Sequence, residues 1–168
     1  LKDAYSDYFK IGCACTGSEF AQGATKDLIK KHYNSLTLGN ELKPDSVLDQ
    51  ALSQKYVAET GDDTMPQISL NEADEILKFA GENKIPVRGH VLVWHSQTPT
   101  WWFREDFKSD GAYVSKEEMN KRIDWYIEKV GKHFDTKFPG LIYAWDVVNE
   151  QASDAGGIRM GTDWAAIY

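Results

Sequence analysis

No apolar run of about 20 residues, the length that a transmembrane helix needs, occurs anywhere in the 168-residue sequence. Internal repeats, linkers and low-complexity tracts are also absent. Residues 1–4 lack the basic and apolar regions of a signal peptide, so we expect the start of a mature or trimmed chain, which leaves secretion open. The length is typical of a single domain, and we expect one globular domain with no membrane partner.

Cysteine is scarce, and the only two residues of this type are Cys13 and Cys15. Side chains two positions apart on a strand point to the same face, and such a pair is hard to close into a disulfide. No accompanying pattern of Cys and His suggests a metal site. We expect two small buried thiols, which leave the redox compartment undecided.

Basic residues are in the minority, with 19 Lys and Arg against 26 Asp and Glu and a net charge of −7. Proteins that bind nucleic acids need a basic surface, so the charge argues against a nucleic-acid partner and fits a neutral ligand better. The sequence contains six Trp residues, and three of them lie close together at Trp94, Trp101 and Trp102. Trp is also a common core residue, so its number alone decides little.

The chain alternates between short apolar strands and amphipathic helices. Apolar runs rich in β-branched residues predict strands over 9–15, 35–38, 86–94 and 141–148. Helical spacing predicts helices over 25–33, after Ser69, after Ser115 and over 162–168, with a short helix near 47–52. Both serines stand three residues before a Glu, which is the capping-box pattern. The alternation predicts a parallel sheet covered by helices, with ligands at the carboxyl ends of the strands.

Polar, aromatic and ionisable residues collect where three of the predicted strands end. In chain order they are Asn40, Glu41, Lys43, His90, Trp94, His95, Gln97, Asn149 and Glu150. Each has an ordinary structural explanation by itself, because a strand-end Glu is commonly a surface residue and His or Trp commonly packs in a core. Their joint occurrence at three successive strand ends favours a functional site.

Side chains repeat every two residues along a strand, which predicts the faces on which these residues lie. The third predicted strand should present on one face His90, Leu92 and Trp94. The fourth should present on one face Asp146, Val148 and Glu150. If these faces look into a barrel, the last of these residues lies at its rim.

Glu150 has the position of a general acid. We expect an apolar strand and tryptophans to exclude water from its carboxyl group, which favours the protonated form. A general acid needs that proton near neutral pH. Beside it, the amide of Asn149 can hydrogen-bond a sugar hydroxyl, and the ring of Trp94 offers a flat apolar surface to the C–H face of a pyranose.

Three segments resemble a known enzyme family. Residues 88–101 and 145–150 closely resemble the family-10 glycoside hydrolases, the xylanase family, and residues 40–44 resemble the second-strand motif of that family. The resemblance covers the whole chain in order. It implies an α/β fold, the (β/α)8 TIM barrel, of which residues 1–168 carry strands one to four as the N-terminal half of a single catalytic domain. It further implies that xylan is hydrolysed with retention of configuration and without a metal or organic cofactor.

The resemblance also implies roles for individual residues. It places the general acid/base on Glu150, with Asn149 contacting the sugar next to the cleaved bond. It assigns the binding of substrate on the glycone side of the cleft to five residues: Asn40, Lys43, His90, Trp94 and Gln97. Two further positions, His95 and Asp146, match residues that support the site without catalysing the reaction.

Two departures from the family pattern stand out. The family usually has Glu where this chain has Gly39, so one glycone-side hydrogen bond is expected to be missing. We expect Glu41, two residues on, to face solvent or to pair with a local cation. A retaining glycosidase also needs a second carboxylate, the nucleophile, about 5–5.5 Å from the first. The Thr-Glu-Leu-Asp-like motif that supplies it in this family is absent from the 168 residues.

Half a barrel has two open sheet edges and an uncovered apolar face. The C-terminal half is therefore an expected partner, supplied by the same protein, by a second chain or by self-pairing, and the chain alone is expected to be inactive. An alternative function is that of a non-catalytic sugar-binding or assembly fragment, and a weaker one is that of a β-1,4-glucanase. An extracellular location is expected because polymeric xylan cannot enter a cell.

Overall fold

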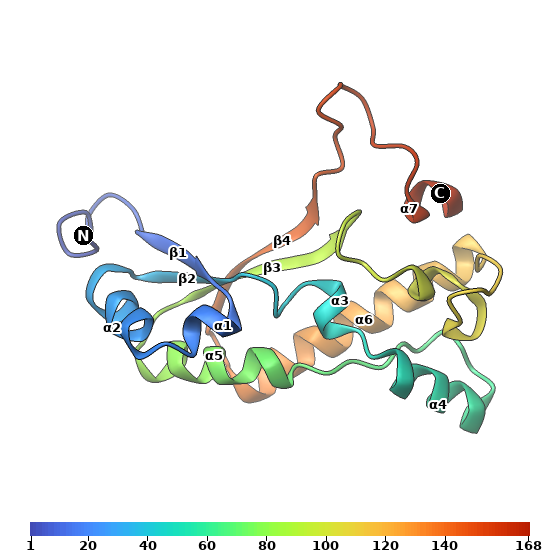
Figure 1. Cartoon of the computed structure of the whole chain (residues 1–168), viewed down its shortest axis with the longest axis horizontal. Helices are drawn as coiled ribbons and strands as arrows, with labels where there is room; N and C mark the ends of the chain where they lie inside the picture. Colours follow the sequence, from blue (N-terminus) through green and yellow to red (C-terminus); the bar gives the residue numbers. More distant parts are fainter.

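The computed structural model describes residues 1–168 and contains one parallel sheet. Its strands are β1 (Gly12–Cys15), β2 (Ser35–Leu38), β3 (Val87–Trp94) and β4 (Ile142–Asn149). They lie side by side in chain order, and every neighbouring pair is parallel (Figure 1). Right-handed crossovers between successive parallel strands in this order place the connecting helices on the same face of the sheet. This is the topology of consecutive units of a barrel.

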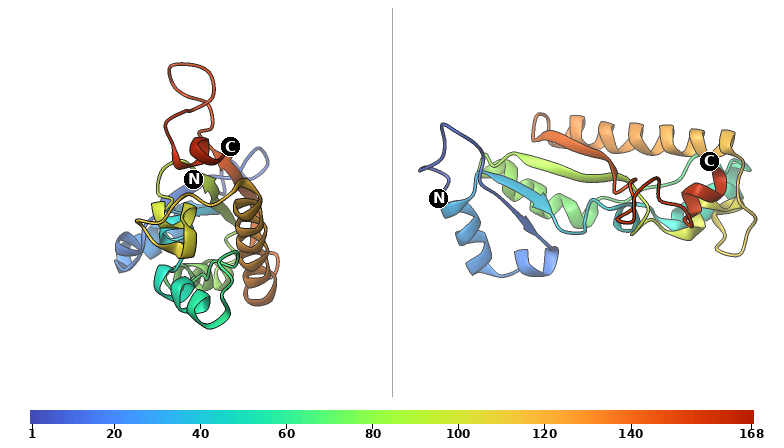
Figure 2. Two further views of the ribbon diagram at one scale, coloured as in Figure 1. Left: turned by 90° about the vertical axis from the view of Figure 1, so that its right-hand side faces the viewer. Right: turned by 90° about the horizontal axis from the view of Figure 1, so that it is seen from above.

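Six α-helices and two short 3-10 helices lie between the strands, and a seventh α-helix follows β4. They are α1 (Gly17–Phe20), α2 (Gly23–His32), α3 (Pro44–Val47), α4 (Gln50–Thr60), α5 (Asn71–Glu82), η1 (Thr100–Phe103), η2 (Glu105–Phe107), α6 (Lys116–Lys137) and α7 (Asp163–Ile167). Figures 1 and 2 show α2, α5 and α6 on the same side of the sheet. Not one of these helices combines the length and the hydrophobicity that crossing a bilayer requires.

The main hydrophobic core contains 25 buried residues between the sheet and its helices. Leu36 and Leu38 of β2 are completely buried in it. The helix α5 contributes apolar residues three or four positions apart, the spacing of one helix face: Ala73, Ile76, Leu77 and Ala80. The opposite face of the sheet is more polar and carries Ser35, Thr37, Arg88, His90 and Asp146 around an open hollow.

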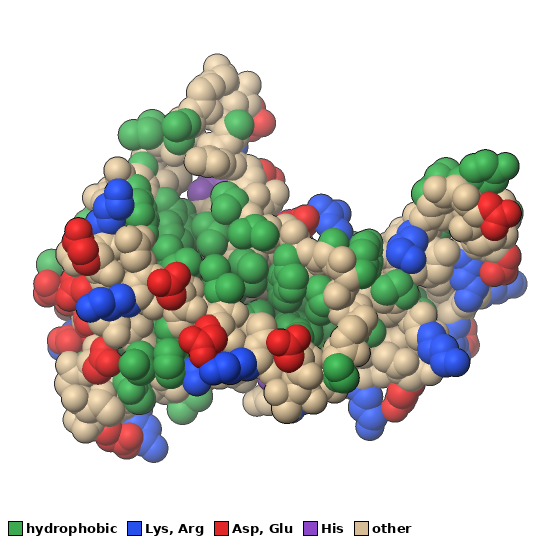
Figure 3. Space-filling view, turned by 180° about the vertical axis from the view of Figure 1, so that it is seen from behind, with side chains coloured by type: hydrophobic (Ala, Val, Ile, Leu, Met, Phe, Trp, Pro, Cys, Tyr) green, Lys and Arg blue, Asp and Glu red, His purple; other side chains and the backbone are tan.

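The edge strand β4 is poorly covered. Its residues Tyr143, Val147 and Val148 are 47%, 54% and 56% exposed. Figure 3 shows hydrophobic side chains gathered across the middle of one face of the molecule. An apolar edge strand of this kind has unpaired backbone groups and apolar surface available for a further strand.

The sheet confirms the predicted strands with small changes at their ends. The strand over 35–38 is found as predicted, whereas β1 begins at Gly12 rather than at Phe9. Phe9 instead stacks on Tyr5 in the N-terminal segment, with ring centres 5.3 Å apart. Both cysteines are free, as expected, but Cys13 is only half-buried. Burial and the neighbouring Cys15 raise the pKa of the Cys13 thiol to about 11, so this thiol is protonated at neutral pH.

One of the two predicted capping boxes is wrong. The Ser115 hydroxyl accepts a hydrogen bond from the Glu118 amide at 3.2 Å, and the Glu118 carboxylate accepts one from the Ser115 amide at 2.9 Å. Ser69 makes no such bonds, because α5 begins only at Asn71, with an N-cap residue that gives no side-chain bond. The Ser69 amide instead donates to the Val47 carbonyl at 2.8 Å, in the short pairing that surrounds the bridge between Leu48 and Ile68.

The predicted strand face is wrong for Leu92, and two-residue alternation does not apply to Glu150. The register of β3 against β4 shifts between His90 and Val93, and this irregularity turns Leu92 into the hydrophobic core, away from His90 and Trp94. At the end of β4, Glu150 lies beyond the last strand residue and has a φ of +52°, so the two-residue alternation no longer sets its direction. Both departures come from local backbone irregularities that a strict alternation cannot describe.

Candidate active site

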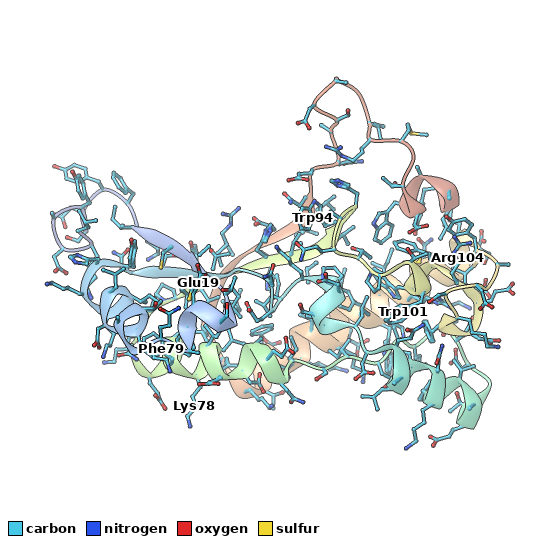
Figure 4. All side chains as sticks on the ribbon, viewed as in Figure 1. Glu19, Lys78, Phe79, Trp94, Trp101 and Arg104 are labelled. Atoms are coloured by element: carbon cyan, nitrogen blue, oxygen red, sulfur yellow. The ribbon has the colours of Figure 1, made fainter.

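The carboxyl ends of β2, β3 and β4 meet at one end of the sheet, as predicted. Figure 4 shows Trp94 at the end of β3, next to the point where β4 also ends. In the register of the two strands, Trp94 is paired with Asn149. A pocket of about 430 Å³ opens here, and its wall includes Trp94, Asn149, Glu150 and residues of the segment that leads to α7.

Four of the predicted binding residues form one polar cluster. Lys43 donates to the Asn40 side-chain oxygen at 2.9 Å and to the Gln97 side-chain oxygen at 2.6 Å. The same ammonium group lies 5.3 Å from the centre of the Trp94 ring, which is within the range of a cation–π contact. The loop after β3 is tied to α3 by a hydrogen bond of 2.9 Å from the Asp45 amide to the Gln97 carbonyl. The cluster therefore joins the loops that follow β2 and β3.

The Glu150 carboxylate lies against the side chains of Trp94 and His95. The Trp94 indole donates to one carboxylate oxygen of Glu150 at 2.9 Å, and His95 Nδ1 lies 3.8 Å from the same oxygen. The expectation that water is excluded from this carboxylate is wrong for this chain, because the Glu150 side chain is 49% exposed. Its position beyond the end of an edge strand explains the exposure, since no strand lies on its other side.

His90 is held by a network on the polar face of the sheet. His90 Nδ1 donates to one oxygen of the Asp146 carboxylate at 2.8 Å, and Arg88 donates to the other oxygen at 2.7 and 3.0 Å. Burial raises the pKa of Asp146, but hydrogen bonds from His90 and Arg88 and the positive charge of Arg88 outweigh it, so this pKa lies below its usual range. Asp146 therefore stays ionised and orients the His90 ring.

Glu41 contradicts its prediction, because it does not face solvent and has no cation as its partner. Its side chain is buried, and its two oxygens accept hydrogen bonds from the amides of Gly17 at 2.5 Å and Asn40 at 3.0 Å. Burial of a carboxylate is tolerated when backbone N–H groups satisfy it. Glu41 thus ties the end of β1 to the end of β2 and supports the backbone of Asn40.

The structure gives a steric reason for the glycine at position 39. A Cβ atom on Gly39 would lie 2.6 Å from Cγ2 of Thr16 and 3.2 Å from the Thr16 backbone nitrogen. Thr16 is the N-cap of α1 and forms a capping box with Glu19. The loop after β1 therefore fills the space that a side chain at position 39 needs. This capping box, the second in the structure beside that of Ser115 and Glu118, was not predicted from the sequence, and it holds that loop in place.

Two contributors to the site were missed in the sequence. Trp164 in α7 donates from its indole nitrogen to the Trp94 carbonyl at 2.9 Å, and Arg159 donates to the Glu150 carbonyl at 3.1 Å. The only signal in the sequence is the proximity of Arg159, nine residues after Glu150. Within the chain, no group of three or more His, Cys, Asp or Glu side chains is placed to hold a metal ion.

Comparisons with known proteins identify the family. The family model of glycosyl hydrolase family 10 matches residues 1–167. The chain is 46% identical over 172 residues to the bifunctional endo-1,4-beta-xylanase XylA of Ruminococcus flavefaciens, which covers 100% of the chain and 17% of the relative. It is 41% identical over 155 residues to endo-1,4-beta-xylanase Y of Acetivibrio thermocellus, covering 92% of the chain and 14% of the relative.

Solved structures agree with these relatives. The endo-1,4-beta-D-xylanase of Clostridium thermocellum complexed with xylohexaose has a TM-score of 0.87 and 37% identity, over 100% of the chain and 34% of the solved chain. An intracellular xylanase of Thermoanaerobacterium saccharolyticum complexed with xylotetraose has a TM-score of 0.79 and 31% identity, over 99% of the chain and 48% of the solved chain. The chain thus spans less than half the length of each of these relatives.

These matches confirm the predicted fold class, because the four parallel strands and their helices correspond to the N-terminal half of a (β/α)8 barrel. The strand-end cluster lies where such barrels carry their active sites. From its sequence, its fold and the matched residues 1–167, the chain belongs to glycosyl hydrolase family 10.

Proposed function

We propose that residues 1–168 are the N-terminal half of the catalytic domain of an endo-β-1,4-xylanase that retains the configuration of the cleaved sugar. The observation that carries this proposal is a set of contacts at one end of a parallel sheet. They connect Glu150 to Trp94, and Trp94 to the polar cluster around Lys43. The relatives named above are endo-1,4-beta-xylanases, and one was solved with xylohexaose, which supports xylan as the substrate.

In the proposed mechanism Glu150 is the general acid/base. It donates its proton to the glycosidic oxygen while the bond from that oxygen to the anomeric carbon breaks and the nucleophilic carboxylate bonds to the same carbon. It then takes a proton from the water that releases the sugar. The nucleophile is a second Glu outside these residues, about 5–5.5 Å from Glu150 in the complete barrel. The half-exposed Glu150 carboxylate is accessible to a polymeric substrate.

The remaining site residues bind the neutral sugar chain. The side-chain groups of Asn40, Lys43, Gln97 and Asn149 offer hydrogen bonds to hydroxyl groups, and the Trp94 ring packs against a pyranose face. His90, oriented by Asp146, supplies a further polar contact. No metal or organic cofactor takes part in this proposal, because two carboxylates are sufficient for retaining hydrolysis.

The proposed partner is the C-terminal half of the barrel. The edge strands β1 and β4 have backbone groups available for pairing, and the exposed Val147 and Val148 of β4 would be covered by a following strand. We propose an extracellular location, because polymeric xylan does not enter a cell. The structural relative from Thermoanaerobacterium saccharolyticum is an intracellular xylanase, so family membership alone does not decide the location.

The Glu150→Ala variant of the full-length protein tests the acid assignment. We expect kcat/KM to fall by orders of magnitude for phenyl β-xylobioside, whose leaving group needs protonation, and far less for the 2,4-dinitrophenyl glycoside, whose leaving group does not. Glu82→Ala, at the exposed end of α5, is the control and should change neither rate. Equal losses on both substrates would contradict the assignment. Faster hydrolysis of carboxymethylcellulose than of xylan by the wild type would favour the glucanase alternative.

A further inference from the structure

The backbone at Glu150 has an unusual conformation. Glu150 follows the last residue of β4, and its φ of +52° lies in the left-handed region, where residues with a Cβ atom are uncommon. The direction of the Glu150 side chain depends on this single turn, because the strand no longer sets it. A conformation of this kind persists only when surrounding contacts hold it.

Arg159, nine residues after Glu150 in the segment between β4 and α7, makes hydrogen bonds that hold this turn. Its Nε donates to the Glu150 carbonyl at 3.1 Å, and its Nη2 donates to the Ala152 carbonyl at 3.3 Å. Its backbone amide donates to the Gln151 carbonyl at 2.9 Å, beside a bridge between Ala152 and Ile158. One residue therefore satisfies three successive carbonyls of the turn. Its side chain is 24% exposed, and it forms an ion pair with the solvent-exposed carboxylate of Asp154 at 3.8 Å.

The far end of the same segment is anchored at the end of β3. Trp164 donates to the Trp94 carbonyl at 2.9 Å, and its ring packs edge-on against Trp102 and Phe103 with centres 5.5 and 4.8 Å apart. Figure 1 shows the segment leaving β4 and returning to α7. Glu150 is thus held twice, at its carboxylate by the Trp94 indole and at its backbone by Arg159.

We propose that Arg159 is a positioning residue that fixes the left-handed turn and thereby aims the Glu150 carboxyl at the leaving-group oxygen. The inference rests on the proposed function, in which Glu150 is the general acid/base. Arg159 acts through the backbone, because its donors go to carbonyl oxygens rather than to the carboxylate. A guanidinium group presents its N–H donors in a rigid fork, whereas Lys has a single ammonium group and reproduces only part of this arrangement.

Kinetics of Arg159→Met and Arg159→Lys in the full-length protein test the inference. We expect Arg159→Met to lower kcat/KM for phenyl β-xylobioside roughly tenfold or more, and to change the value for the 2,4-dinitrophenyl glycoside much less, because misplacing the acid affects only substrates that need a proton. Arg159→Lys should recover part of the loss. Asp154→Asn removes the exposed carboxylate beside Arg159 and should leave both rates unchanged.

The outcomes separate this inference from the proposed function. Rates are compared below the Tm of every variant, so that loss of folded protein does not enter. Equal losses on both substrates, or a lower Tm with unchanged kinetics, would show that Arg159 only stabilises the fold of this segment. Either result would overturn the inference. A leaving-group-dependent loss in Glu150→Ala but not in Arg159→Met or Arg159→Lys rejects the Arg159 role alone. If Glu150→Ala shows no leaving-group-dependent loss of rate, both the acid assignment and the inference are rejected.

Discussion

Gly39 and Thr16 form a steric pair at the ends of β1 and β2. The Thr16 methyl group occupies the position next to which a Cβ atom at residue 39 would lie, at a distance of 2.6 Å. The Thr16 hydroxyl and amide are both bonded to the Glu19 carboxylate at 2.8 and 2.9 Å, so Thr16 cannot easily move aside. The Thr16 side chain therefore favours glycine, the residue without a Cβ atom, at position 39.

The contact between positions 39 and 16 predicts that a substitution at Thr16 recovers stability lost by a substitution at Gly39. Gly39→Ala should lower the free energy of unfolding by about 1–3 kcal/mol, the usual cost of overpacking, as measured by urea titration. Thr16→Ser removes the methyl group but keeps the capping hydroxyl, so the double variant should recover part of this loss. Gly131→Ala in α6, where a new Cβ meets nothing within 4 Å, is the control and should be neutral or stabilising. A double variant no more stable than Gly39→Ala would disprove the coupling.

At the scale of elements, α5 and α6 show that one sequence pattern has two outcomes. Both helices follow a Ser three residues before a Glu, yet only α6 uses the Ser as its N-cap. The start of α5 is set by the pairing between Leu48 and Ile68, which binds the Ser69 amide to another segment before the helix begins. A contact with a segment 20 residues earlier in the chain thus overrides the local signal.

The two serines give a matched comparison of stability. Ser115→Ala should cost about 1 kcal/mol of unfolding free energy, because it removes the hydroxyl that accepts from the Glu118 amide. Ser69→Ala should cost clearly less, since its hydroxyl caps no helix. Chemical denaturation of the two variants side by side measures the difference. Equal costs would show that the Ser69 hydroxyl also contributes to the start of α5.

At the scale of the whole molecule, the sheet ends in two strands that each lack one neighbour. β4 leaves Tyr143, Val147 and Val148 about half exposed, and the carboxylate of Glu150 projects at the same edge. Closure of the barrel would cover the apolar residues and would place less water around Glu150.

The open edges predict the behaviour of the isolated chain. A polypeptide of residues 1–168, purified to homogeneity, should release no reducing sugar from xylan, because no second carboxylate of the retaining pair is present. Mixing it with a separately produced C-terminal half should restore hydrolysis if the two halves pair through β1 and β4. Xylan hydrolysis by the isolated chain would show that catalysis does not need the other half.

Much of the architecture followed from local patterns in the sequence. Apolar runs rich in β-branched residues predicted the four strands, and helical spacing predicted α2, α5 and α6, because burial of one face imposes a period of about 3.6 on a helix. The meeting of Asn40, Lys43, Gln97 and Trp94 was also predictable, since the carboxyl ends of parallel strands lie at one edge of a sheet.

What the sequence by itself determined, then, is the order of the elements, the family and the edge at which the polar residues gather. The tertiary structure alone decided that Glu41 is buried against the amides of Gly17 and Asn40, and that Glu150 is half exposed in a left-handed turn. It also decided that Arg159 returns to hold that turn. The physical reason is that burial, hydrogen-bond partners and strained backbone conformations depend on segments distant in sequence, which local periodicity does not specify.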